Sequence, residues 1–183
     1  MDGPNVNKKF LRDLILQRES SNPDISGLLD LGVCGLHVVH GAFRTGFEKT
    51  GWKIERFLRS LWYLLNESPA RRQDFIEITG CTIYFPLQFC GTRWIEDINV
   101  AERAIFIWDS IEKYFEHIAA GPKVKVPKCS SFTVLQNAHN DPLTRAKLHV
   151  FISIAKIMQL FLETFQISRP MIPFLAEKLE KKS

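Results

Sequence analysis

Apolar residues recur with helical spacing along most of the chain. From Asn5 to Arg18, apolar positions three and four residues apart alternate with charged ones, which predicts an amphipathic helix. The same spacing returns from His37 to Lys49 and from Lys53 to Leu65. The third segment has a single apolar stripe, which predicts that one face of this helix is buried; its members are Ile54, Phe57, Leu58, Leu61, Trp62 and Leu65.

Capping residues predict where the next helices begin. Ser68 followed by Pro69 is typical of a helix start, so we expect a short helix to about Ile78 that Gly80 ends. An irregular aromatic stretch then leads into a helix expected from Ile95 to about His117. Its inward positions are predicted to be Val100, Ala104, Ile107, Trp108 and Ile111.

The last third of the chain contains an exposed loop and a long apolar segment. Residues 121–128 contain two prolines and three lysines, which predicts an exposed loop near 121–130. Asp141-Pro142 is expected to open a helix to about Phe165, and Arg169-Pro170 to break it before a last short helix. The apolar segment is interrupted by polar residues too often for a membrane span, which predicts a buried helix instead.

Only one stretch is predicted to be a strand. Residues Ile25 to Cys34 form a short apolar run bounded by turn residues, which favours a buried strand over a helix. The predicted fold is therefore mainly α, with an α/β segment at the N-terminus.

Composition and charge restrict the class of protein without naming a function. A chain of 183 residues that is 45% hydrophobic can bury a core. Its formal charge of +4 is compatible with a polyanionic partner but does not require one. Four scattered cysteines and no apolar leader predict an intracellular protein without membrane attachment.

Cys34, His37 and His40 lie close together directly after the predicted strand. A thiol and two imidazoles are ligands that zinc accepts, but structural zinc needs four ligands, usually as two close pairs. No second pair with suitable spacing follows, so a packed thiol and hydrogen-bonded histidines are the simpler interpretation. We expect no metal site.

Two other short motifs combine basic and aromatic residues. Arg71 and Arg72 follow the predicted helix start at Ser68, where they could hold phosphates or form a solvated basic face. Arg93 and Trp94 close the run Cys90-Gly-Thr-Arg-Trp94. Tryptophan beside arginine can stack on an unpaired base; alternatively Trp94 anchors the next helix while Arg93 pairs with an acidic residue.

Four runs, in this order, resemble the motifs of hAT superfamily DNA transposases and the cellular proteins derived from them. They are Asp2-Gly-Pro-Asn-Val-Asn7, Cys34-Gly-Leu-His37, Ser68-Pro-Ala-Arg-Arg72 and Cys90-Gly-Thr-Arg-Trp94. The resemblance implies a partial RNase H-like catalytic segment over residues 1–45 and a helical insertion over residues 46–183. It also implies a nuclear location.

The resemblance also assigns roles to individual residues. Asp2 matches the second of three metal-binding acids that would use Mg²⁺ or Mn²⁺, Cys34 and His37 match the family's Cys-x-x-His motif, and Trp94 matches a tryptophan that stacks near the cleaved DNA end. The first acid would lie before Met1, and no glutamate before Ser183 can be assigned as the third. Because two-metal chemistry requires converging ligands, we expect Asp2 to be vestigial and the chain to be inactive and without a cofactor.

Two functions remain open at this stage. The first is a transposase-derived fragment that binds DNA weakly through Arg71, Arg72, Arg93 and Trp94. The second is a protein interaction or dimerisation module without DNA binding, because a helical insertion separated from its parent domain would expose apolar faces.

Overall fold

The computed structural model describes residues 5–21, 35–121 and 126–165, and all elements in these ranges are helical. The chain divides into two compact units, residues 1–42 and 43–183. The predicted mainly helical fold is confirmed, whereas the predicted strand from Ile25 to Cys34 and the last short helix lie outside the described residues. The first unit contains α1 (Asn5–Ser21) and the beginning of α2 (Gly35–Lys49).

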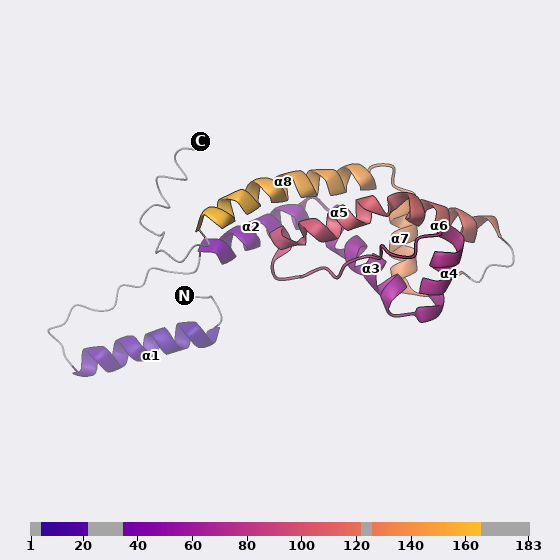
Figure 1. The fold of residues 1–183 in the computed structure, drawn as a ribbon. Helices are drawn as coiled ribbons and strands as arrows, with labels where there is room; N and C mark the ends of the chain where they lie inside the picture. The colour runs from indigo at the N-terminus through magenta and orange to yellow at the C-terminus, as the bar shows by residue number, and fades with distance from the viewer. Residues whose placement is uncertain (1–4, 22–34, 122–125, 166–183) are drawn as a thin grey trace. The chain divides into compact units, whose positions relative to one another are not determined.

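The second unit contains the remainder of α2 and every later element (Figure 1). In chain order these are α3 (Ile54–Asn66), α4 (Pro69–Thr79), the 3-10 turn η1 (Trp94–Asp97), α5 (Ile98–Phe106), α6 (Trp108–Ala120), α7 (Ser130–His139) and α8 (Thr144–Phe165). Neighbouring pairs are α3 with α7, α4 with α6, and α5 with α8. The second half of α2 lies beside α8, because Phe43 and Phe47 contact the Phe151 ring at centroid distances of 5.4 and 5.2 Å.

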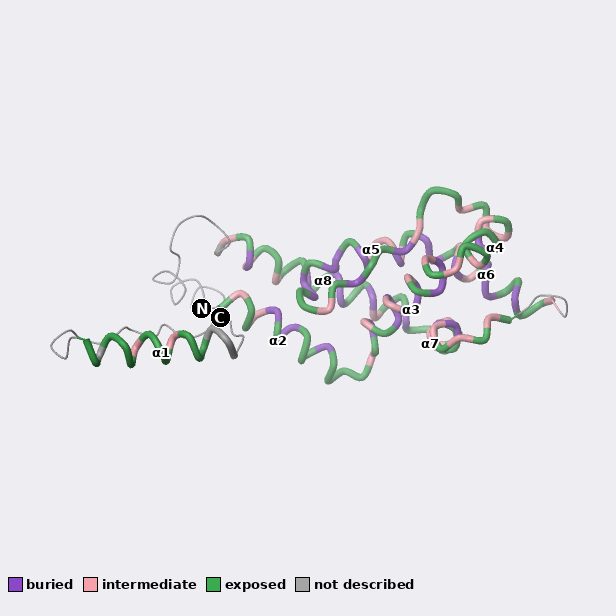
Figure 2. Tube along the Cα trace, turned by 90° about the horizontal axis from the view of Figure 1, so that it is seen from below, coloured by how far each residue is buried: buried purple, intermediate pink, exposed green. Residues whose placement is uncertain are grey.

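The core of the second unit follows the predicted apolar stripe of α3. Buried and exposed positions alternate along α3 (Figure 2). Ile54, Phe57 and Leu61 are buried as expected, whereas Trp62 is half-buried and Leu64 is buried instead. On α8 the buried residues include Leu148, Phe151 and Ala155. None of the helices in the described ranges has the length and apolar content that crossing a membrane would need.

The start and end of α4 are as predicted. The Ser68 hydroxyl accepts a hydrogen bond from the Arg71 backbone N–H at 3.4 Å, and Pro69 occupies the first helical position. At the other end Gly80 has a φ of 73° and donates its N–H to the Ile76 carbonyl. Only glycine adopts this conformation at little cost, so the helix ends there.

Three predicted boundaries are wrong. The expected helix from Ile95 to His117 is broken at Ile107, so that α5 faces α8 and α6 faces α4. A helix was not predicted where α7 lies, and the loop before it ends at Cys129. The long helix begins at Thr144 rather than at Pro142, because Asp141 forms a turn in which its side chain accepts the Leu143 N–H at 2.9 Å.

Candidate functional site

Arg71 and Arg72 lie in the first turn of α4, which contains no acidic residue. The Arg71 guanidinium contacts the Cys129 sulfur at 3.2 Å, and the Arg72 guanidinium lies 3.8 Å from the centre of the Phe85 ring. Within the described part of the chain neither arginine has a carboxylate at ion-pair distance. Both cations are therefore held in place by neutral groups, with their charge uncompensated by a direct partner.

The side chain of Trp94 is buried, with 3% of its surface exposed. Its ring packs edge-on against Phe89 at a centroid distance of 5.4 Å. The indole N–H has no hydrogen-bond partner among the described residues. Of the two alternatives for Trp94, an exposed platform for an unpaired base or an anchor for the next helix, the burial of the ring agrees with the anchor at the start of η1.

Arg93, next to Trp94, is an exposed residue that pairs with Glu96 at 3.2 Å. Its side chain is 56% exposed, so the pair is solvated and contributes little to stability. The sequence left two alternatives for Arg93, a DNA contact beside Trp94 or an ion pair with an acidic residue, and the structure has the ion pair. The geometry brings Arg93 together with Glu96 and not with Arg71 or Arg72.

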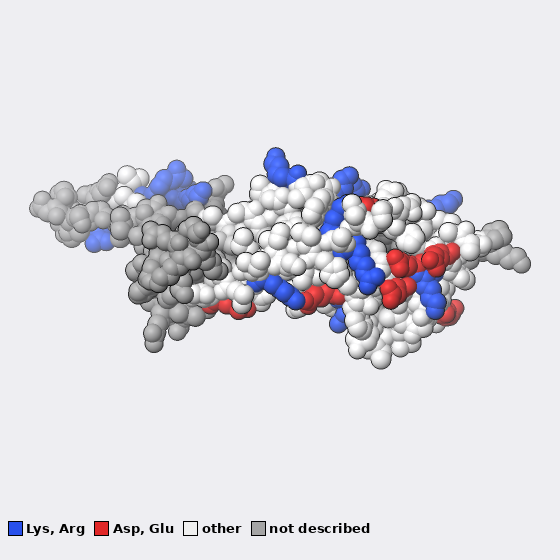
Figure 3. Space-filling view, turned by 90° about the horizontal axis from the view of Figure 1, so that it is seen from above, with Lys and Arg blue, Asp and Glu red and all other residues white. Residues whose placement is uncertain are grey.

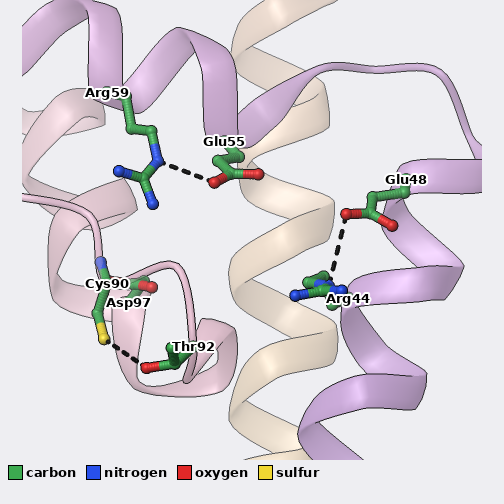
Figure 4. Close-up of polar contacts among 7 residues, drawn as sticks. All are labelled: Arg44, Glu48, Glu55, Arg59, Cys90, Thr92 and Asp97. Carbon is green, nitrogen blue, oxygen red and sulfur yellow. Dashed lines mark hydrogen bonds and ion pairs between the residues drawn. The ribbon is translucent and has the colours of Figure 1, made fainter.

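Asp97 closes the loop that carries the Cys90-Gly-Thr-Arg-Trp94 motif (Figure 4). One carboxylate oxygen, Oδ1, accepts the Cys90 N–H at 2.7 Å, whereas Oδ2 has no partner in the described ranges. Asp97 is only 2% exposed, and this burial raises the pKa of its carboxyl from 3.8 to about 7. Sequence reasoning considered Asp97 only as a possible ion-pair partner of Arg93 and did not predict its burial, because an acid four residues after an arginine usually remains at the surface.

Helix α3 contacts this loop through an arginine and a glutamate. Arg59 pairs with Glu55 at 2.8 Å, and its guanidinium lies so close to Gly91 that a Cβ at this position would displace the end of the arginine side chain. The Cys90 sulfur lies 3.4 Å from the Thr92 hydroxyl, and this hydrogen bond lowers the pKa of the exposed thiol. The loop thus lies against α3 and carries an exposed thiol whose pKa is lowered.

The remaining residues assigned by the resemblance are placed only in part. Asp2 and Cys34 lie outside the described residues. His37 and His40 are on α2, where His37 is exposed and His40 is buried. Among the residues that the structure describes, no three histidine, cysteine or acidic side chains are grouped closely enough to hold a metal ion.

A cleft of about 680 Å³ opens between α4, α6 and the segment before α7, and we refer to it as the α4–α6 cleft. Arg71 and Lys128 line it together with Asp74 and Glu77. Tyr114 lies beneath, and burial, followed by the charge of Asp74, raises the pKa of its phenol. Two cations and two carboxylates, with His117, leave this cleft close to charge balance.

The searches against known proteins add no relative. No model of a protein family, no curated protein and no solved structure matches the chain.

Proposed function

We propose that the chain is a helical module of hAT transposase descent that binds DNA weakly, with Arg71 and Arg72 at the start of α4 as its phosphate contacts. The single observation that carries the proposal is that both guanidinium groups are held by neutral neighbours, Cys129 and Phe85, rather than by carboxylates. Arg72 is also exposed. Arginines that are held in place without a direct ion pair are ready to bind phosphate oxygens at small entropic cost.

The position of these arginines on α4 adds a second argument. The first turn of a helix carries a partial positive charge from its unpaired N–H groups, so acidic residues are favoured there and basic ones are not. Two arginines in that turn without an acid raise the local positive potential. A bound phosphate would relieve this repulsion, which makes the helix start suitable for an anionic partner.

Charge elsewhere on the second unit limits the expected affinity. Lysine and arginine side chains lie beside aspartate and glutamate side chains on the face drawn in Figure 3. Several form pairs, including Arg145 with Asp109 at 3.8 Å and Lys156 with Glu102 at 2.6 Å. A surface of mixed sign supports weak binding that is sensitive to salt rather than a tight complex.

The resemblance supplies the rest of the proposal. The RNase H-like character of residues 1–45, the role of Cys34 and His37 in the family's motif, and nuclear location are inferred from the four motifs alone. We propose no cleavage chemistry for these residues, since only Asp2 matches one of the three metal-binding acids. Cleavage of labelled DNA with Mg²⁺ or Mn²⁺ that Asp2→Ala abolishes would contradict this part.

Fluorescence anisotropy with duplex, hairpin and single-stranded DNA across a salt series tests the DNA binding. We expect the apparent Kd to rise with salt, and each lost phosphate contact on duplex DNA to reduce the slope of log Kd against log salt by about 0.9. Arg71→Ala and Arg72→Ala should weaken binding, whereas the control Arg44→Ala should not, because Arg44 pairs with Glu48 at 3.5 Å. No binding by a folded chain, or equal loss in the control, would exclude the α4 site.

A second candidate function, self-association, is favoured by one face of α8. Val150, Ile154, Ile157 and Leu160 are all exposed and lie three or four residues apart, so they form an apolar stripe on the helix surface. Size-exclusion chromatography with light scattering tests it: a dimer without DNA that Ile157→Glu converts to a monomer supports dimerisation. A monomer at all accessible concentrations would eliminate it.

A further inference from the structure

A second cleft, of about 420 Å³, lies between the start of α3, one side of α7 and the start of α8, and we refer to it as the α3–α7–α8 cleft. Three cations line it, from the turn before α3, from α3 itself and from α8: Lys53, Arg56 and Lys147. Its one carboxylate belongs to Asp141. No motif in the sequence identified this cleft, because its walls come from residues 51–57 and 130–148.

The single carboxylate of this cleft is already occupied. The ammonium of Lys147 and the backbone N–H of Leu143 both donate to Asp141, and the Lys147 hydrogen bond lowers the pKa of that carboxyl. In the part of the chain that the structure describes, Lys53 and Arg56 have no carboxylate at ion-pair distance. Two exposed cations therefore line a concave site without a direct ion-pair partner among the described residues.

Neutral hydrogen-bonding groups and one aromatic ring complete the lining. Ser130, Thr133 and Asn137 provide hydroxyls and an amide along α7. Trp52, half-buried, lines the opposite side and packs edge-on against Phe47 at a centroid distance of 6.2 Å. Cations, hydroxyls and an indole in a cleft of this size, within the usual ~300–1,000 Å³ of ligand sites, match the groups that a nucleoside phosphate needs.

The backbone at Lys53 supports the same interpretation. Lys53 has φ 54° and ψ 33°, the left-handed conformation that costs a non-glycine residue about 1–2 kcal/mol. It is also the N-cap of α3 and forms no side-chain cap hydrogen bond. A cation at the positive end of a helix, in a strained conformation, is unfavourable for folding, and an anion bound beside it would offset the repulsion.

We propose that the α3–α7–α8 cleft binds a nucleoside phosphate, with Lys53 and Arg56 as the partners of the phosphate and Trp52 beside the base. The same group occurs in a free nucleotide and in a nucleic-acid strand. The inference deepens the proposed DNA binding by adding a second phosphate site, and it rests on that function only for its nucleic-acid form. Its residues are separate from Arg71 and Arg72, so the two sites can fail independently.

Titration of the full chain with a fluorescent adenosine triphosphate analogue and with a labelled single-stranded oligonucleotide tests the cleft. We expect Arg56→Gln and Lys53→Gln each to weaken binding about tenfold, the value of one lost charge-assisted hydrogen bond. Arg44→Gln is the matched control, because Arg44 is exposed and paired with Glu48. Arg56 is exposed and has no ion pair among the described residues, so its substitution should leave the fold intact.

The outcomes separate the two sources of the phosphate. Loss with both probes shows a site for nucleoside phosphates in general, and loss with only one probe identifies the free nucleotide or the strand as the source. If Lys53→Gln and Arg56→Gln leave the binding of both probes unchanged while DNA binding still depends on Arg71 and Arg72, the cleft is overturned and the proposed function remains intact. Binding that depends on Lys53 and Arg56 but not on Arg71 and Arg72 supports the cleft and excludes the α4 site.

A second measurement does not depend on variants. Acetylation of Lys53 with an acylating reagent, followed by mass spectrometry, should slow several-fold when either probe is bound, whereas exposed Lys113, outside the cleft, should react at an unchanged rate. Neither probe binding to the folded protein, or binding without protection of Lys53, would overturn the proposal.

Discussion

The α4–α6 cleft and the α3–α7–α8 cleft differ in charge rather than in kind. Both are concave and lie between helices of the second unit, and both contain arginine and lysine. In the first, Asp74 and Glu77 line the cleft beside Arg71 and Lys128. In the second, Asp141 is bound by Lys147, and Lys53 and Arg56 have no ion-pair partner among the described residues. Glu48 and Glu55 share a smaller hollow with these two cations but pair with Arg44 and Arg59. Basic residues in a motif therefore indicate an anion site only when the acids brought beside them by the fold are also known.

The largest expected effect comes from removing the buried Trp94 ring near the α3–α7–α8 cleft. Trp94 lines a hollow of about 240 Å³ that shares Lys53 and Arg56 with the α3–α7–α8 cleft. Trp94→Ala should lower the free energy of unfolding by about 3–5 kcal/mol, because it removes a buried aromatic ring. Urea denaturation measures this loss.

Trp94→Phe is the matched control. It keeps an aromatic ring in place and removes the remainder of the indole with an N–H that has no partner among the described residues, so the cost should be clearly smaller than for alanine. Equal losses for alanine and phenylalanine would mean that a phenyl ring at this position does not stabilise the start of η1.

The second prediction concerns the pH dependence of the stability of the fold, which we expect to depend on Asp97. Burial raises the pKa of Asp97 to about 7, so the folded protein holds this proton more tightly than the unfolded chain does. The free energy of unfolding should therefore fall as pH rises from about 4 to about 7, by at most about 1.4 kcal/mol per pH unit, and level off above. Among the neighbouring charges, Arg59 lowers the pKa of Asp97, whereas Glu96 and Glu55 raise it.

Asp97→Asn should flatten this pH dependence, because an amide keeps an acceptor for the Cys90 N–H but carries no charge. Urea denaturation of both proteins at several pH values between about 5 and 8 gives the comparison. Parallel curves for the two proteins would place the titrating group elsewhere.

Local sequence signals located most helix ends but not the cationic cleft. Ser68, Pro69 and Gly80 predicted α4 closely, because caps and glycine act through backbone geometry within a few residues. The break at Ile107 has no glycine or proline to mark it. It arises because α5 and α6 pack against different helices, which is a tertiary effect that periodicity does not contain.

The candidate sites show the same limit. The motif arginines were found by their residue type, but the burial of Trp94 depends on Phe89 and on the position of η1. The α3–α7–α8 cleft was missed because one of its walls, α7, was not predicted at all. Its strained Lys53 gives no sequence signal, since lysine is not a residue that indicates a left-handed conformation.

The third prediction tests whether strain and binding are linked at the cationic cleft. Lys53→Gly should raise the free energy of unfolding by about 1 kcal/mol, because glycine adopts the left-handed conformation without steric cost. The same change removes one of the two uncompensated cations and should weaken phosphate binding. Thermal denaturation and nucleotide titration measure the two effects on one sample.

Lys53→Asn distinguishes conformation from charge in this test. Asparagine tolerates the left-handed region better than lysine, so part of the gain in stability should remain while the charge is lost. A variant that is more stable and binds as tightly as the original protein would show that Lys53 has no role in the cleft.

The smallest expected effect comes from removing the carboxylates of the α4–α6 cleft, which makes its charge resemble that of the α3–α7–α8 cleft. Asp74→Asn combined with Glu77→Gln removes both carboxylates that line the α4–α6 cleft and leaves Arg71 and Lys128 in place. Because Asp74 and Glu77 are exposed, each contributes only a fraction of a kcal/mol, and DNA affinity should rise a few-fold at low salt. Gln73→Glu on the same helix is the control with the opposite sign. If removing the two acids leaves DNA affinity unchanged while Arg71→Ala still weakens it, the charge balance of this cleft does not limit binding, and the two clefts differ in shape instead.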